Sequence, residues 1–77
     1  MKDEDLAPHI GKSVSLVIPI RRRISISTYG MLNFSKKDGD NPEIYYWLPG
    51  EASTIFYITD VKSVEVSELL GIVIRLF

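Results

Sequence analysis

The chain has 77 residues and a formal net charge of −1, from nine Lys and Arg residues against ten Asp and Glu residues. This length fits one domain (1–77), and so balanced a charge gives no overall attraction to nucleic acid or anionic lipid. The lack of cysteine excludes a disulfide-framed secreted mini-protein, and a cytoplasmic location fits best. Every apolar run is far shorter than the roughly 20 residues of a membrane span, so we expect no membrane segment.

Acidic residues followed by a few apolar ones open the chain. Asp3 or Asp5 is suited to cap a single helical turn, and Pro8 keeps that helix short because it is tolerated only in a first turn. We expect Leu6 and Ile10 to face inward, so that this helical turn forms a lid over one open end of a barrel.

Alternation of apolar and polar side chains dominates the next part of the chain and predicts strands, since successive strand residues point to opposite faces. A first strand over residues 12–18 should end or bend at Pro19, which has no N–H for a ladder bond. The second strand, about residues 23–35, is too long to stay flat in so small a domain, and Gly30 is its natural bend or bulge. A long, bent strand lets one sheet form both layers of a barrel.

Turn-forming residues divide the rest of the chain into shorter strands. An Asp-Gly pair predicts a turn over residues 36–42, and a Pro-Gly pair predicts another over residues 49–52. Alternation predicts strands at residues 43–48, 53–59, around 64–66, and 71–77, with a tight turn at Asp60 and a connection at 67–71. We therefore expect an all-β fold, a strongly bent antiparallel barrel of about five or six strands with a short N-terminal helical turn.

Two features carry a family resemblance. Residues 5–14 (DLAPHIGKSV) place a short helix directly before an Ile-Gly-Lys-x-Val start to the first strand, and the long second strand contains a glycine before apolar residues, in Gly30-Met31-Leu32. This arrangement resembles the Sm-like small β-barrel family. The resemblance covers most of the chain as topology and a short stretch as sequence, and it implies ring-like self-association through edge strands.

The resemblance also bears on RNA binding. Sm-like RNA binders hold a base with an Asp and an Asn that follow the second strand, and Asp38 and Asn41 lie in that region here, in a turn-forming context. The family's late basic glycine motif has no counterpart, because the corresponding residues are Glu68-Leu69-Leu70-Gly71.

Three consecutive arginines, Arg21, Arg22 and Arg23, lie in the predicted connection between the first two strands. Three guanidinium groups in one loop can bind phosphates bidentately, which makes RNA or nucleotide binding the alternative function. The competing interpretation is a solvated loop whose charge protects a sheet edge from aggregation. Lys36 and Lys37 are further candidates for a nucleic-acid site, but a straight second strand would put them about 40 Å from the arginines.

Consecutive aromatic residues mark the third predicted strand. Tyr45, Tyr46 and Trp47 must divide between two faces, so that one set enters the core. The other set, Tyr45 and Trp47 with Phe56 or Ile58 beside them, is expected to form a protein interface. The alternatives are a second small core under the N-terminal segment and a base-stacking platform.

The last predicted strand is apolar on both faces except for Arg75, which alternates with Val73 and Phe77 on one of them. Such an edge is either blunted by its charge or used to pair with another subunit, and the two apolar faces favour pairing. We therefore expect a non-enzymatic interaction module that self-associates through apolar strands and has itself, or another protein, as its partner. The expected interface residues are Tyr45, Trp47, Phe56, Val73, Arg75 and Phe77.

Motifs for chemistry are missing from the sequence. His9 has no cysteine or suitably spaced carboxylate with which to bind a metal, so we predict no metal and no cofactor. An enzyme would need a strongly perturbed carboxylate in a cleft, such as Asp60 or Glu65, which the sequence does not indicate. Small size without recognisable chemistry also suits an accessory protein of a phage or mobile element that blocks a host partner.

Overall fold

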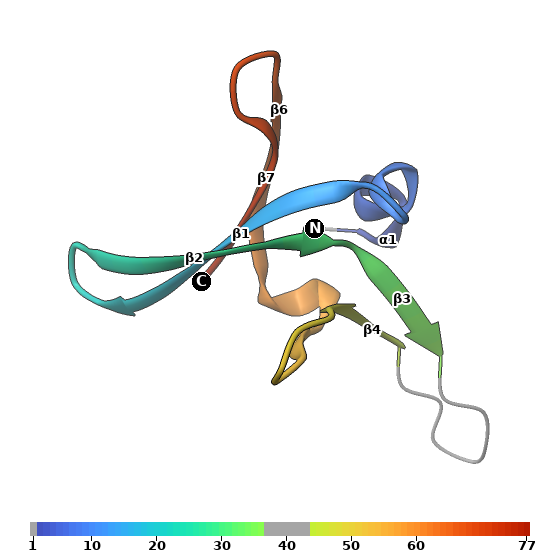
Figure 1. Cartoon of the computed structure of the whole chain (residues 1–77), viewed down its shortest axis with the longest axis horizontal. Coiled ribbons are helices and arrows are strands. Elements are labelled where there is room, and N and C mark those ends of the chain that lie inside the picture. Colours follow the sequence, from blue (N-terminus) through green and yellow to red (C-terminus); the bar gives the residue numbers. More distant parts are fainter. Residues whose placement is uncertain (1, 37–43) are drawn as a thin grey trace.

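The computed structural model describes residues 2–36 and 44–77 as two open sheets with a short helix at the N-terminus (Figure 1). The helix α1 (Asp3–Leu6) runs into a 3₁₀ turn, η1 (Ala7–His9). The first sheet has the order β2-β1-β7-β6, and its strands are β1 (Ser13–Arg21), β2 (Ile24–Met31), β6 (Val61–Ser67) and β7 (Gly71–Leu76). The second sheet has the order β3-β4-β5, and its strands are β3 (Asn33–Lys36), β4 (Ile44–Leu48) and β5 (Thr54–Phe56). A second 3₁₀ turn, η2 (Ile58–Asp60), leads from β5 to β6.

The mainly β fold with a short N-terminal helix is confirmed, but the strand pairing differs from the expected antiparallel barrel. The described residues form seven strands, and β1 pairs with β7 in parallel, with Val14 opposite Ile72 and Leu16 opposite Ile74. The second sheet, β3 to β5, lies in the sequence between the β1–β2 and β6–β7 hairpins. This long connection allows β7 to lie beside β1 in the same direction. Within the described part of the chain, the strand pairs make two open sheets and do not close a barrel.

The long second strand divides at Leu32 and not at Gly30. The backbone N–H of Leu32 donates to the carbonyl of Lys12 at 2.9 Å, and the carbonyl of Leu32 accepts from Gly11 at 2.7 Å. These bonds and the complete burial of the Leu32 side chain turn the chain from β2 in one sheet to β3 in the other. A Cβ atom at Gly30 would lie 3.7 Å from that of Leu48, an ordinary contact, so Gly30 is not required for a close approach.

The first strand continues past Pro19 to Arg21. Pro19 lies opposite Ser25 in β2, and the register shifts between Pro19 and Arg21, which is the irregularity that the proline predicts. Strand β7 accompanies β1 only as far as Val17. The β1–β2 hairpin therefore extends as a two-stranded arm beyond the rest of its sheet, and this arm reaches away from the body in Figure 1.

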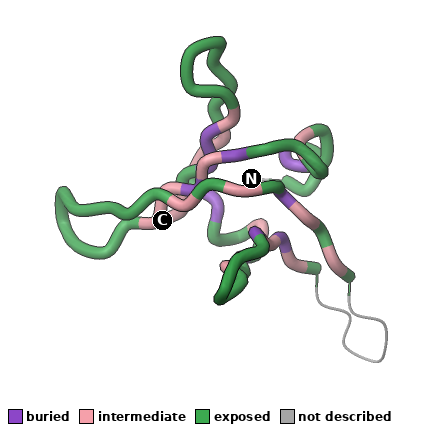
Figure 2. The backbone as a smooth tube through the Cα atoms, in the orientation of Figure 1, coloured by how far each residue is buried: buried purple, intermediate pink, exposed green. Residues whose placement is uncertain are grey.

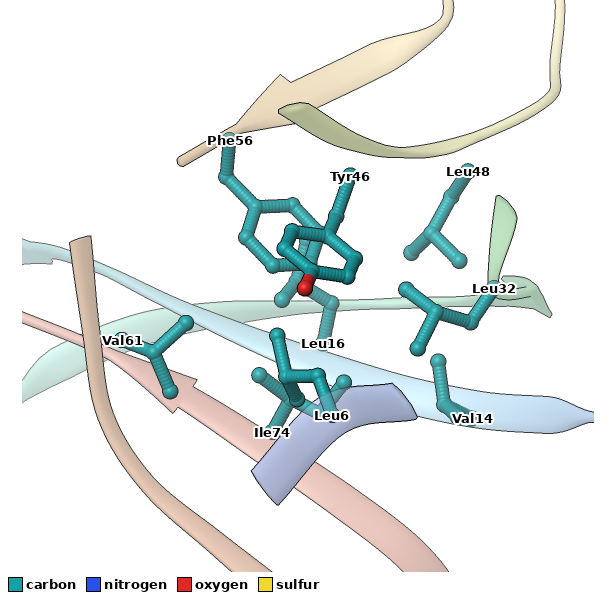
Figure 3. Packing of buried hydrophobic residues seen from close by; sticks show 9 residues of the cluster. All are labelled: Leu6, Val14, Leu16, Leu32, Tyr46, Leu48, Phe56, Val61 and Ile74. Carbon is teal, nitrogen blue, oxygen red and sulfur yellow. The ribbon is translucent and has the colours of Figure 1, made fainter. Parts of the chain in front are cut away.

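The hydrophobic core lies between the two sheets, and the N-terminal helix closes one side of it (Figure 3). Its members come from α1, the centre of the first sheet, the bend between the sheets, and β4 to β6: Leu6, Val14, Leu16, Leu32, Tyr46, Leu48, Phe56, Val61 and Ile74. Full burial of an aliphatic or aromatic side chain contributes about 1.5–3 kcal/mol, so this cluster is the main source of stability.

The predicted inward orientation is confirmed for Leu6, which is completely buried, but not for Ile10, which is 39% exposed. The chain turns after η1 at Gly11, whose φ is +84°. Neither acidic residue caps the helix as predicted, because Lys2 is the N-cap and Asp5 lies inside the first turn, where its Oδ2 accepts the backbone N–H of Lys2 at 2.9 Å. No helix in the described residues has the length and apolar character needed to cross a membrane.

Candidate interaction surface

The core face of the first sheet continues past the core onto the β1–β2 hairpin. Ile18 in β1 lies opposite Ile26 in β2, and Ile24 follows on the same face of β2 toward the turn. Ile20 lies beside them in β1, at the register shift between Pro19 and Arg21. Ile18 packs against the edge of the core, whereas the side chains of Ile20, Ile24 and Ile26 are 56%, 52% and 48% exposed. We call these three isoleucines the hairpin face.

The hairpin face is uncovered because the second sheet is too short to reach it. Strands β3 to β5 pack over the centre of the first sheet, and both long hairpins, β1–β2 and β6–β7, extend beyond them (Figure 2). On the β6–β7 hairpin, Val66, Leu69 and Leu70 are likewise exposed. Among the described residues, fourteen large apolar side chains are exposed against ten that are buried. Where such side chains are neighbours, as on the hairpin face, the surface is typical of one that binds a partner.

The three arginines form the end of the β1–β2 arm, and we call this end the arginine turn. Arg21 is the last residue of β1 and pairs with Ile24, so that Arg22 and Arg23 make the turn, and all three side chains are exposed. Arg23 has a φ of 68°, a left-handed conformation that is unfavourable for a residue with a Cβ atom. The hairpin face is thus bordered by three positive charges.

A pocket of about 300 Å³ lies between the N-terminal helix and the second sheet. We call it the helix pocket. Its wall is formed mostly by apolar parts of side chains, with two acidic residues of α1 among them: Asp3, Glu4, Ala7, Ile10, Phe34 and Tyr46, together with Ile44 at the start of β4. The carboxyl groups of Asp3 and Glu4 belong to exposed residues, which gives an apolar pocket with a negatively charged rim.

Tyr46 connects this pocket to the core. Its hydroxyl donates a hydrogen bond to Oδ1 of Asp3 at 2.8 Å. Its ring lies 5.6 Å from that of Phe34 and 5.8 Å from that of Phe56, between centroids. Burial, followed by the hydrogen bond to Asp3 and the charge of Asp3, raises the pKa of Tyr46 well above its usual value. The tyrosine therefore stays neutral and holds Asp3 at the rim of the helix pocket.

A second hollow, of about 320 Å³, lies on the face of the first sheet that points away from the core. Val73 and Arg75 of β7 contribute to it, with Leu70 from the β6–β7 turn above them. Val73 is buried there, and Arg75 forms an exposed ion pair with Glu65, with 3.5 Å between Nε and Oε1. Exposed pairs of this kind contribute little to stability. Of the two residues that the sequence favoured here, Val73 is therefore covered and Arg75 is exposed at the hollow.

The aromatic residues of the predicted interface fall in different environments. Tyr45 and Trp47 are partly buried on one face of β4, where Trp47 lies opposite Ile55 of β5 and Asn33 of β3. Phe56 pairs with Tyr46 on the other face and is buried in the core, so its ring offers no surface to a partner. Phe77 is 77% exposed at the end of the chain. The predicted set therefore does not form one continuous patch.

The basic residues are also divided. Lys36, the last residue of β3, lies at the far end of the molecule from the arginine turn (Figure 1). The structure does not bring these positive charges into one surface. Lys37, Asp38 and Asn41, which the sequence suggested for nucleic-acid binding, lie outside the described residues.

The acidic residues considered for catalysis have structural partners. Asp60 accepts the backbone N–H of Tyr57 at 2.8 Å and thereby closes the η2 turn, while Glu65 faces Arg75. Nδ1 of His9 is buried without a hydrogen-bond partner in the described part of the chain. Over residues 2–36 and 44–77, no three His, Cys, Asp or Glu side chains gather closely enough to hold a metal ion.

Comparisons of the chain with protein-family models, with curated proteins and with solved structures found no match.

Proposed function

We propose that this protein is a non-enzymatic interaction module that self-associates through the hairpin face. The observation that supports this proposal is the exposure of Ile24 and Ile26 on the same sheet face that elsewhere forms the core, with Ile20 exposed beside them at the register shift of β1. Isoleucines in this position leave apolar area in water, and covering them contributes roughly 25 cal/mol for each Å² removed from solvent. The arm is held away from the body, so a partner can reach its apolar face.

The open edge of β2 adds to this argument. Strand β2 is one of the two edge strands of the first sheet, and most of its residues are exposed. Exposed apolar edge strands tend to pair with other chains unless charges or bulges prevent it. Here the arginines border only the tip of the arm, and the strand next to them remains apolar on one face.

The proposal moves the interface from the residues that the sequence favoured to the β1–β2 hairpin. Phe77, Tyr45 and Trp47 stay as secondary candidates. The closed Sm-like barrel, with ring assembly through its edge strands, remains a prediction and would require pairing between sheets that the described strands do not make. Self-association through the hairpin face does not depend on that closure.

Nucleic-acid binding through Arg21, Arg22 and Arg23 is the second candidate, since all three arginines are exposed in one turn. It is less well supported, because binding to nucleic acid normally uses several phosphate contacts, and Lys36 at the end of β3 lies far from this turn.

The test compares the masses of two variants by sedimentation equilibrium. Replacing both Ile20 and Ile24 by Ser should weaken association about 100-fold, since each substitution removes about 1.4 kcal/mol of apolar contact. Tyr29→Ser is the matched control, because Tyr29 is 73% exposed on the opposite face of β2. Association that survives in the double variant, or that Tyr29→Ser weakens equally, would contradict the proposal.

A further inference from the structure

We infer that the hairpin face of one molecule binds in the helix pocket of a second copy, so that the chains associate head to tail. This inference rests on the proposed function and names the surface that receives the hairpin. The occupant of the helix pocket is thus the β1–β2 arm of another molecule, with its isoleucines against the apolar wall and its arginines at the acidic rim.

Charge complementarity is the first argument. The arm ends in Arg21, Arg22 and Arg23, whereas the pocket is bordered by Asp3 and Glu4 of α1. With a net charge of only −1, the chain as a whole neither attracts nor strongly repels a second copy. Because the positive charges lie on the arm and the negative charges lie at the pocket, the arm of one copy is attracted to the pocket of another. The planar guanidinium groups also match carboxylates in geometry.

Apolar complementarity is the second argument. The wall of the helix pocket includes Ala7, Ile10 and Phe34, and Ile10 and Phe34 are exposed in the single chain. Its volume of about 300 Å³ is at the lower limit for small-molecule sites, which suits one or two aliphatic side chains. Ile20 and Ile24 are the exposed aliphatic residues next to the arginines, so they reach the wall when the arginines reach the rim.

The placement of the two surfaces gives the third argument. In Figure 1 the turn of the β1–β2 hairpin lies toward one end of the molecule, and α1 and β3, which contribute residues to the helix pocket, lie toward the other. The longest extent is 39 Å. A molecule that offers its arm at one end keeps its own pocket available at the other. Such a contact is heterologous, and it closes into a ring or grows into a filament according to the rotation between neighbours.

Charge reversal tests this inference. The first variant carries Arg21→Glu, Arg22→Glu and Arg23→Glu, and the second carries Asp3→Lys and Glu4→Lys. Each should associate at least about tenfold more weakly than the wild-type chain, because like charges then face each other. An equal mixture of the two should regain association, since the reversed arm fits the reversed rim and the native arm fits the native rim.

Two controls distinguish the loss of pocket binding from the loss of folding and from the change in net charge. Glu51→Lys with Glu68→Lys gives the same change in net charge as the rim variant, at exposed acidic residues that do not line the pocket, and should leave association unchanged. Glu4→Lys alone keeps the hydrogen bond between Asp3 and Tyr46 and should still weaken association. Cooperative thermal unfolding identifies variants that fold.

The possible results discriminate the inference from the proposed function. If the folded rim variants associate like the wild-type chain while Ile20→Ser with Ile24→Ser does not, the head-to-tail contact is wrong and self-association through the hairpin stands. If only the arginine variant loses association, the arm binds another acidic surface, and the inference is overturned. If the wild-type chain does not associate at all, both are overturned. The head-to-tail contact is supported only if association recovers when the two charge-reversed variants are mixed.

Discussion

The hydroxyl of Tyr46 donates a hydrogen bond to the carboxylate of Asp3 at 2.8 Å, although 43 residues separate them in the chain. This bond attaches the N-terminal helix to the central strand of the second sheet. It also fixes one of the two acidic residues that border the helix pocket. A single contact thus connects the stability of the core to the shape of a proposed binding surface.

Removal of this bond should destabilise the protein. Tyr46→Phe keeps the buried ring and its contacts with Phe34 and Phe56 but deletes the donor to Asp3. We expect a loss of about 1 kcal/mol in the free energy of unfolding, as is typical for one hydrogen bond. Urea denaturation measures this loss, with Tyr29→Phe as a control at an exposed tyrosine. Equal stability of both variants would show that the bond contributes nothing.

The same tyrosine should make stability depend on alkaline pH. Burial and Asp3 raise its pKa in the folded protein, whereas in the unfolded chain the tyrosine ionises near its usual value of about 10. The contribution of Tyr46 to stability is therefore complete below about pH 10 and decreases as the pH rises further, because the unfolded state loses its proton first. Unfolding at about pH 8 and at about pH 11 should show a smaller decrease for Tyr46→Phe than for the wild-type chain. Identical decreases would contradict this assignment.

Leu6 should be the main anchor of the N-terminal helix. Its side chain is completely buried in the core, so Leu6→Ala removes apolar contacts and leaves a cavity at a cost of about 3 kcal/mol. That is a large part of the roughly 5 kcal/mol expected for so small a domain. Ile10→Ala, at a residue that is 39% exposed, should cost less than about 1 kcal/mol. Similar midpoints for the two variants in urea would show that the helix is not held by Leu6.

The arginine turn should gain stability from one substitution. Arg23 has a positive φ of 68°, which a glycine adopts without steric cost, so Arg23→Gly should raise the free energy of unfolding by about 0.5 kcal/mol. Arg22→Gly removes the same charge at a residue without a positive φ and should be neutral or destabilising. Thermal unfolding midpoints compare the two variants. Equal increases in the midpoint for both variants would indicate that the effect comes from charge and not from the backbone of Arg23.

Binding to RNA should be negligible if the arginines serve a protein contact. A titration of a short mixed RNA at low salt should give no saturable binding, and replacement of Arg21, Arg22 and Arg23 by Ala should not change that result. Tight binding that falls steeply with salt and disappears in the triple variant would favour the nucleic-acid alternative, because neutralised phosphates release counterions.

Alternation was enough to predict most of the strands, because it reports which residues share a face. It did not locate the bend at Leu32, since the two hydrogen bonds that make it come from Gly11 and Lys12, far away in the chain. The parallel pairing of β1 with β7 was missed for a similar reason, as no local signal marks a partner 58 residues away, the separation between Val14 and Ile72.

The candidate surface was harder to predict than the fold. The sequence placed Ile24 and Ile26 on an apolar strand face, but alternation cannot tell where a core ends. That boundary is set by the short second sheet, which covers the centre of the first sheet and leaves the hairpin exposed. The sequence instead favoured the aromatic residues as the interface, but Phe56 lies in the core, where β5 pairs it with Tyr46.

Self-association is the central claim, and sedimentation equilibrium of the wild-type chain from micromolar to millimolar concentration tests it most directly. We predict an average mass that rises above that of the 8.7 kDa chain as the concentration increases. A mass that stays at 8.7 kDa across the whole range would contradict the account.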